Sequence, residues 1–503
     1  MGVDPDVRAA IGVVLCPRWP LGRDGLDLAD GGPLLHPGGF CVFRATLPAA
    51  LDGLSDLRRA RGETGWPYIC SDFERGAGQQ IDGMTRLPPA LALGAADDEA
   101  LAFEAGRNTG LEALTAGVQF VFAPVLDVAN EPRNPIVATR AFAADPATVA
   151  RMANAWIRGC QSTGAIATGK HYPGHGATTE DSHLELPVLR RSEPELAAFE
   201  EVPFAATIAA GVGAMMIGHL HVPSIETEAD APASLSRAVI HERLRRRLGF
   251  DGLVFTDALD MGAIARPTGD DPGAEPAVRC LNAGSDVALL PDDPARAARN
   301  MLLAVQRGIL PRERLLEAAA RIRAAVARVP ARRLPARTAE ADGADLALRI
   351  ARASVTVAPG TTPQRIVLRR NEDIECACID DGDAAASLPH LIDRMLAFGL
   401  RVRSVAAPSG KLPCLIAIFS DVRAWKGRVL LDPERATRLS TWLRTTGTRA
   451  VLASIGCPQA ALPYAASAPC VFVYDSDEAS LTALAEVLSG RSVPHGKPVF
   501  VPS

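Results

Sequence analysis

Short apolar runs alternate with longer helix-like segments through the first 300 residues of the chain. The runs are rich in β-branched and aromatic residues and are flanked by glycine and proline, which favours strands. They lie at residues 11–16, 40–44, 67–72, 119–127, 165–171, 214–221, 253–260 and 287–291. The segments between them, such as 97–114 and 145–164, are rich in alanine and leucine and carry charges on one face, as amphipathic helices do.

This alternation predicts the fold class. Strands that alternate with helices imply a parallel sheet, and eight such units in roughly 300 residues fit a (β/α)8 TIM-type barrel. An open doubly wound sheet is the alternative. No GxGxxG motif follows the first strand to give that alternative a nucleotide site, and the sequence predicts no cofactor.

The pattern changes near residue 330, where proline, arginine and alanine accumulate before a new series of apolar runs such as 450–458. A chain of 503 residues is long enough for two or three domains. We therefore predict an α/β protein with a barrel at 1–330, a linker at 331–350 and a smaller three-layer α/β sandwich domain at 351–503.

Polar residues fall at the carboxyl ends of the predicted strands, which is the edge where barrels build active sites. A single aspartate at a strand end is usually a helix cap, but several polar strand ends on one rim favour a functional site. The residues concerned are Asp72, Asp127, Lys170, His171, His219 and Asp257.

Three of the nine histidines lie in one turn-rich stretch, "GKHYPGHGATTEDSHLELP" at 169–187. His171 and His175 have the spacing of two metal ligands on a helix, but Pro173, Gly174 and Gly176 break that helix, so no metal site is predicted. His183, with an ordinary pKa of ~6.5, can donate and accept a proton near neutrality. Asp181 can orient its imidazole. A polar loop without chemistry, with His175 in a structural role, is the alternative.

Asp257, in "VFTDALDMGAI", is a candidate nucleophile. A carboxylate at the end of a buried strand can attack an electrophilic carbon and form a covalent intermediate. The alternative is that Asp257 caps a helix over 258–264.

Charge and hydropathy limit the partners. A net charge of -5 that is spread along the chain argues against nucleic acid and anionic membranes. We interpret the Arg-rich stretch at 241–250 as the solvated face of a helix. No run approaches the ~18 apolar residues of a membrane span, and the amino terminus lacks a signal-like apolar core. The sequence predicts a cytoplasmic protein and leaves its oligomeric state open.

The loop sequence resembles the KHFPGHG…DSH…LP signature of glycoside hydrolase family 3, in its bacterial β-N-acetylglucosaminidase (β-hexosaminidase) branch. The resemblance continues through "SDFERGAG" (71–78), "APVLDVANEPRNPIVATRAF" (123–142), "GHLHVPSIE" (218–226) and "GFDGLVFTDALDMGAI" (249–264). It covers essentially the whole first predicted domain.

The resemblance implies a retaining exo-β-glycosidase that releases terminal β-linked N-acetylglucosamine and acts in peptidoglycan turnover. Asp257 matches the nucleophile that forms the glycosyl-enzyme, His183 matches the acid/base, and Asp181 matches its partner. The residues that match sugar contacts in the −1 subsite are Asp72, Arg140, Lys170 and His171.

The chain departs from the branch after its third predicted strand. The branch reads D-x-E-G-G-R-V-x-R, whereas this chain reads "DFERGAGQQ", so that Gln80 replaces an arginine that contacts the sugar. A β-glucosidase or β-xylosidase, or a phosphorylase of the same family, is therefore an alternative. An inactive carbohydrate-binding protein is the alternative from another class.

Overall fold

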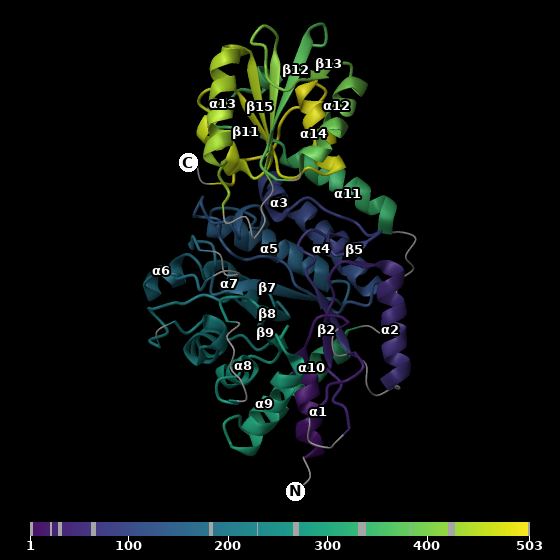
Figure 1. Cartoon of the computed structure of the whole chain (residues 1–503), viewed down its shortest axis with the longest axis vertical. Helices are drawn as coiled ribbons and strands as arrows, with labels where there is room; N and C mark the ends of the chain where they lie inside the picture. The colour runs from purple at the N-terminus through teal and green to yellow at the C-terminus, as the bar shows by residue number, and fades with distance from the viewer. Residues whose placement is uncertain are drawn as a thin grey trace. The chain divides into compact units, whose positions relative to one another are not determined.

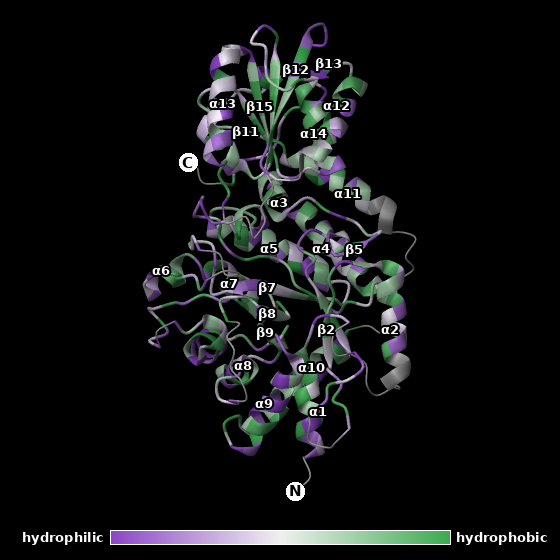
Figure 2. Ribbon diagram, in the orientation of Figure 1, coloured by the Kyte–Doolittle hydropathy of each residue, from purple (hydrophilic) through white to green (hydrophobic). Residues whose placement is uncertain are grey.

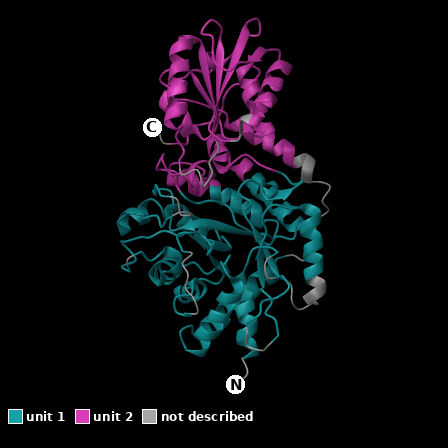
Figure 3. Cartoon of the chain, viewed as in Figure 1, with its two compact units in different colours: residues 1–85, 103–127, 153–340 teal, residues 86–102, 128–152, 341–503 magenta. Residues whose placement is uncertain are grey.

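The chain divides into two compact units, which Figure 3 colours separately. In this computed structural model the described residues are 4–20, 23–28, 33–61, 67–180, 185–228, 230–264, 271–329, 339–382, 384–420 and 428–500. Unit 1 comprises residues 1–85, 103–127 and 153–340, and unit 2 comprises 86–102, 128–152 and 341–503. Two segments from the first 330 residues thus group with the carboxyl-terminal part. The domain boundaries at 330 and 350 stay a prediction.

Unit 1 is built on parallel strands (Figure 1). Its strands are β1 (Leu15–Cys16), β2 (Gly39–Cys41), β3 (Ala45–Thr46), β4 (Tyr68–Ser71), β5 (Ile81–Asp82), β6 (Phe120–Val121), β7 (Ile166–Tyr172), β8 (Ala214–Ile217), β9 (Leu253–Thr256) and β10 (Ala288–Leu289). Within the described residues, one six-stranded sheet has the order β2-β4-β6-β7-β8-β9, and β1 pairs with β10. Parallel bridges from Phe255 to Val287 and from Arg18 to Cys41 link the two sheets. The result is a curled parallel sheet and an α/β, barrel-like unit.

Amphipathic helices cover these strands. They are α1 (Pro5–Val14), α2 (Leu47–Arg61), α4 (Glu99–Thr115), α5 (Pro146–Gln161), α6 (Glu193–Ala198), α7 (Val202–Ala209), η4 (Ala238–Arg247), α8 (Pro276–Ala283), α9 (Pro294–Gln306) and α10 (Arg312–Arg328). In α10 the buried residues Leu315, Ala318, Ala319 and Ile322 are spaced three and four apart, which makes one apolar face. Figure 2 shows the mixture of hydrophobic and hydrophilic residues around α9 and α10. Helices α4 and α5 confirm that the segments predicted at 97–114 and 145–164 are helical.

The first predicted strand, 11–16, is wrong for residues 11–14, which complete α1. The side chain of Asp4 accepts a hydrogen bond from the Asp6 amide, and Pro5 occupies the first helical position, so a helix starts there. Val7, Ala10, Ile11 and Val14 then share a helical face. A short apolar run fits either element, and the upstream cap decides in favour of the helix.

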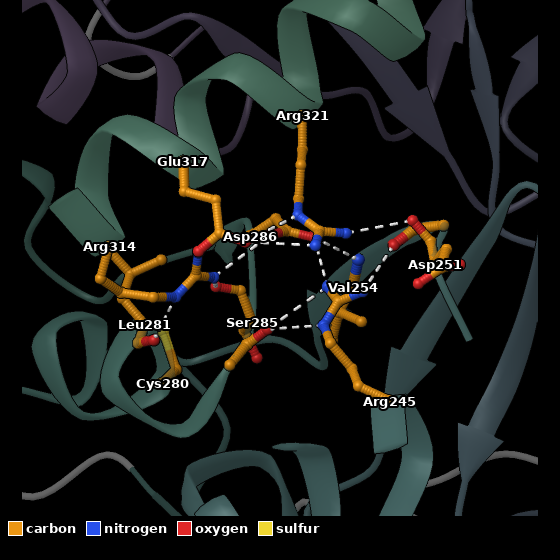
Figure 4. A network of polar contacts seen from close by, with 12 residues as sticks. Arg245, Asp251, Val254, Cys280, Leu281, Ser285, Asp286, Arg314, Glu317 and Arg321 are labelled. Carbon is orange, nitrogen blue, oxygen red and sulfur yellow. Dashed lines mark hydrogen bonds and ion pairs between the residues drawn. The ribbon is translucent and has the colours of Figure 1, made fainter. Parts of the chain in front are cut away.

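An ion-pair network holds the start of β9 (Figure 4). The fully buried Asp286 accepts hydrogen bonds from the Val254 amide at 3.0 Å, from Arg245 Nη2 at 2.7 Å and from Arg314 Nη2 at 3.1 Å. The solvated face predicted for 241–250 is therefore wrong in part. Arg243 is buried as well, with its Nε 2.7 Å from Glu201 Oε1. Such arginines are kept inside by buried carboxylates, which the local sequence around 241–250 does not contain.

Unit 2 contains a mixed sheet. Among its described residues the strand order is β11-β16-β15-β14-β12-β13, with β11 antiparallel to β16 and the other neighbours parallel. Helix α13 lies on one side of the sheet, and α12 and α14 lie on the other (Figure 1). The elements are α3 (Ala90–Ala96), η2 (Ala138–Arg140), α11 (Ala339–Ser354), β11 (Thr356–Val357), β12 (Asp373–Asp380), α12 (Leu388–Ala397), β13 (Arg401–Ser404), β14 (Cys414–Ser420), α13 (Pro433–Thr446), β15 (Ala450–Gly456), β16 (Cys470–Val473) and α14 (Glu478–Leu488).

Candidate active site

The predicted polar residues of unit 1 lie at or after the ends of the parallel strands β4, β6, β7, β8 and β9. Asp72 directly follows β4, and Asp257 directly follows β9. Lys170 and His171 lie near the carboxyl end of β7 (Ile166–Tyr172), directly before its last residue. Because the carboxyl ends of parallel strands meet at one edge, these side chains belong to the same rim.

Lys170 forms ion pairs with two carboxylates. Its side chain is 2% exposed, and its Nζ lies 2.6 Å from Asp72 Oδ1 and 2.6 Å from Glu74 Oε1. Asp72 keeps 28% of its side chain exposed, whereas Glu74 keeps 7%. The ammonium therefore fixes Asp72 while leaving it able to accept hydrogen bonds from a ligand hydroxyl. Glu74 was not predicted. The available signal was its position two residues after Asp72, on the same side of an extended segment.

His171 is oriented by Asp127. The Nδ1 atom of His171 lies 2.7 Å from Asp127 Oδ2, and Asp127 Oδ1 also accepts the His175 amide at 2.6 Å. Burial raises the pKa of Asp127, but the charge and hydrogen bond of His171 outweigh burial, and the pKa ends below its usual value. Asp127 therefore stays ionised and fixes both the imidazole and the start of the histidine loop. The sequence placed Asp127 on the rim without assigning it this role.

Asp257 is held as a carboxylate. Its Oδ1 accepts the Ala258 amide at 2.8 Å, and the side chain is partly exposed. Burial raises the pKa of Asp257, but the charges at His171 and His219, the Ala258 hydrogen bond and Lys170 together lower it to about 2. Residues 258–264 form turns, so the alternative of a helix capped by Asp257 is wrong.

His219 supports the backbone beside Asp257. It is fully buried, its Nε2 donates to the Ala258 carbonyl at 2.8 Å, and its Nδ1 lies 2.8 Å from Ser234 Oγ. Burial lowers the pKa of His219, although the nearby Asp257 carboxylate acts in the opposite direction. His219 thus holds the residue whose amide binds Asp257, a long-range contact that no local pattern announces.

The other predicted site residues are Asp181, His183 and Arg140. Asp181 and His183 lie outside the described residues. Arg140 ends η2 in unit 2, with its Nη1 donating to the Ile136 carbonyl at 3.3 Å. Gln80, at the position where the related branch has arginine, accepts the Arg44 amide through Oε1 at 3.3 Å. Across the described ranges, no group of three His, Cys, Asp or Glu side chains could hold a metal ion.

The stability of the fold should respond to the low pKa of Asp257. Its native value of about 2 lies below the ordinary 3.8, so the ionised carboxylate stabilises the native state. That contribution is complete above about pH 4 and is lost as the pH falls toward about 2. We expect the Tm of the wild type to fall more steeply over this range than that of Asp257→Asn, measured by calorimetry. Parallel Tm curves would show that Asp257 titrates alike in folded and unfolded chains.

Known proteins resemble the chain in sequence and in structure. The model of the glycosyl hydrolase family 3 N-terminal domain matches residues 53–325. A β-hexosaminidase of Thiobacillus denitrificans is 40% identical over 233 residues, which is 45% of this chain and 63% of that protein. One from Chromobacterium violaceum is 35% identical over 299 residues, 56% of this chain and 81% of that protein.

A solved structure matches along the whole chain. The glycoside hydrolase family 3 β-N-acetylglucosaminidase from Paenibacillus sp. str. FPU-7 has a TM-score of 0.84 at 26% identity, covering 100% of this chain and 99% of that one.

None of the helices among the described residues is both long and apolar enough to cross a membrane.

Proposed function

The chain belongs to glycosyl hydrolase family 3 and is therefore a glycoside hydrolase, and on this premise we propose that it is a retaining exo-β-glycosidase acting on terminal β-N-acetylglucosaminides. The observation that carries the proposal is Asp257, an ionised and partly exposed carboxylate at the end of β9. Its neighbourhood supplies the positive charge of Lys170 and the imidazole of His171. The matched β-hexosaminidases and the Paenibacillus enzyme support the choice of sugar.

The proposed reaction has two displacements. In the first, a carboxylate oxygen of Asp257 attacks the anomeric carbon through an oxocarbenium-like transition state, and the bond to the leaving oxygen breaks. His183, oriented by Asp181, gives that oxygen its proton. In the second, water attacks the same carbon, its proton passes to His183, and Asp257 leaves. The sugar is released with its original anomeric configuration.

Sugar binding is proposed for Asp72, Lys170, His171 and Arg140. The ion pair between Lys170 and Asp72 supports this role, because it holds a donor and an acceptor 2.6 Å apart on the rim. The Asp127 carboxylate supports the role of His171 by fixing its ring.

We further propose that the chain consists of a catalytic (β/α)8 barrel followed by a three-layer α/β sandwich domain. A cytoplasmic location and a role in peptidoglycan turnover stay predictions of the sequence.

A panel of aryl β-glycosides with one leaving group tests the sugar. We expect kcat/KM to be highest for N-acetylglucosamine, with glucose and xylose at least about tenfold lower, because one lost substrate contact is typically worth 1–3 kcal/mol. A preference for glucose or xylose would contradict the proposal and favour the β-glucosidase or β-xylosidase alternative.

Running the panel with and without inorganic phosphate tests phosphorolysis. Release that phosphate does not accelerate, with free sugar as the product, supports hydrolysis.

The acid role of His183 predicts a dependence on the leaving group. Good leaving groups need little protonation, so His183→Ala should lower kcat/KM for a dinitrophenyl glycoside by less than about tenfold, but for a disaccharide by about 10³-fold. Both rates are measured on the same preparation. His221→Ala, at a histidine whose Nδ1 binds the Ala231 carbonyl, serves as the control. Equal losses with both substrates would remove His183 from the acid role.

A further inference from the structure

The segment that carries Arg140 is packed on the carboxyl-terminal part of unit 2. Residues 128–152 group with 341–503 in one compact unit. Ala138, the first residue of η2, forms a buried apolar cluster with Val429 and Cys457, which are 8%, 2% and 0% exposed. Cys457 directly follows β15. The cluster therefore joins the turn that ends at Arg140 to the carboxyl edge of the unit 2 sheet.

The end of the same segment is tied to the tail of the chain. The Ala144 amide donates to the Val499 carbonyl at 2.8 Å, and the Lys497 amide donates to the Ala95 carbonyl at 2.8 Å. A side chain at Gly94 would place its Cβ 1.7 Å from the Phe142 carbonyl oxygen, so α3 lies directly against this segment. The tail, through residues 497 and 499, thus hydrogen-bonds to both segments of unit 2 that come from the first 330 residues, 86–102 and 128–152.

The turn before Arg140 is fixed from within as well as from outside. Asn134 Oδ1 accepts the amides of Ile136 and Val137, each at 2.8 Å, and the Arg140 amide donates to the Val137 carbonyl at 2.7 Å. Ala138 has φ +31°, a conformation that residues with a Cβ rarely adopt. A residue in such a conformation persists only where its surroundings over-determine it. Val429 and Cys457 are the surroundings of its side chain.

We propose that residues 341–503 act as the scaffold that positions Arg140, with Val429 as a positioning residue that works through Ala138. This inference rests on the proposed function, in which Arg140 binds the sugar. The cluster could be an ordinary packing contact without effect on catalysis. The positive φ of Ala138, two residues before Arg140 in one turn, favours the positioning role, because loss of its contacts lets that turn relax.

A double-mutant cycle tests the proposal with the full chain. Val429→Ala should lower kcat/KM for the aryl β-N-acetylglucosaminide by about tenfold, mainly through KM, because misplacing a binding group costs that much or more. In the Arg140→Ala background, Val429→Ala should change kcat/KM by less than about twofold, since the group to be positioned is gone. The matched control is Val451→Ala, at the opposite end of β15 and also buried. It should lower the Tm at least as much while keeping kcat/KM.

The possible outcomes distinguish the scaffold role of residues 341–503 from the sugar contact of Arg140. Independent, multiplying losses from Val429→Ala and Arg140→Ala would overturn the scaffold role, and so would an equal loss of kcat/KM in Val451→Ala. Unchanged kcat/KM in Val429→Ala beside a large loss in Arg140→Ala would overturn the scaffold role and leave Arg140 as a sugar contact. Unchanged kcat/KM in Arg140→Ala would overturn the sugar contact and the scaffold together, while leaving Asp257 as the proposed nucleophile.

Discussion

Asp257→Ala is expected to lower kcat for an aryl β-N-acetylglucosaminide by about 10⁴-fold, because the variant has no group that can form the glycosyl-enzyme. The loss should appear with every leaving group, unlike the loss from His183→Ala. Azide should restore turnover, since alanine leaves room for an external nucleophile, and the product should be a glycosyl azide of inverted configuration. Steady-state kinetics and NMR of the product measure both effects.

The matched control is Asp260→Ala. Asp260 lies three residues further along and pairs with Arg18 at 3.2 Å, with both side chains substantially exposed. Its removal should leave kcat within about twofold, because an exposed ion pair contributes little. Full activity in Asp257→Ala would show that another group is the nucleophile.

Lys170→Met is expected to abolish measurable hydrolysis and to lower the free energy of unfolding by about 3 kcal/mol. The substitution keeps the buried stem but leaves Asp72 and Glu74 facing one another without the ammonium that each contacts at 2.6 Å. Uncompensated charge in a poorly solvated site is costly, whereas the partial exposure of Asp72 moderates the loss. Urea unfolding followed by circular dichroism measures the change.

Two further variants make this test specific. Lys497→Met removes a lysine that is largely exposed and pairs with Asp97, which Arg151 also contacts, and it should cost less than about 1 kcal/mol. Adding Asp72→Asn to Lys170→Met should recover part of the lost stability, because it removes one of the two stranded charges. If Lys170→Met unfolded at the urea concentration of the wild type, the ammonium would have no role in holding the carboxylates.

Residues whose role depends on strand position were predictable from the sequence. Lys170 and Asp72 were assigned to one rim because parallel strands finish at one edge, and the structure joins them by an ion pair. The Asp257 carboxylate lies at its expected strand end for the same reason. Such positions follow from the alternation of hydrophobic runs and from the succession of strands along the chain. Both features can be recognised from the local sequence.

Residues whose role depends on distant partners were not predictable. His219 binds the Ala258 carbonyl across 39 positions of sequence, and Arg243 is buried because Glu201 lies beside it. The grouping of 128–152 with the carboxyl-terminal part likewise depends on Val429 and Val499, which no pattern near Arg140 reveals. Periodicity and motif spacing are present in the sequence itself, whereas these contacts form only when the chain has folded.

The two ends of β9 carry separate tasks. Asp286, Arg245 and Arg314 secure its beginning through the Val254 amide, and Asp257 follows its last residue. Substitutions on the rim that spare Lys170 and its two carboxylates therefore leave the anchor of the strand intact. The replacement of the usual arginine by Gln80 is a change of this kind. For directed evolution, a library that randomises positions 78–80 while keeping Gly76, the buried Ala77 and Asp286 with its arginines should retain a high proportion of folded members from which new sugar preferences can be selected.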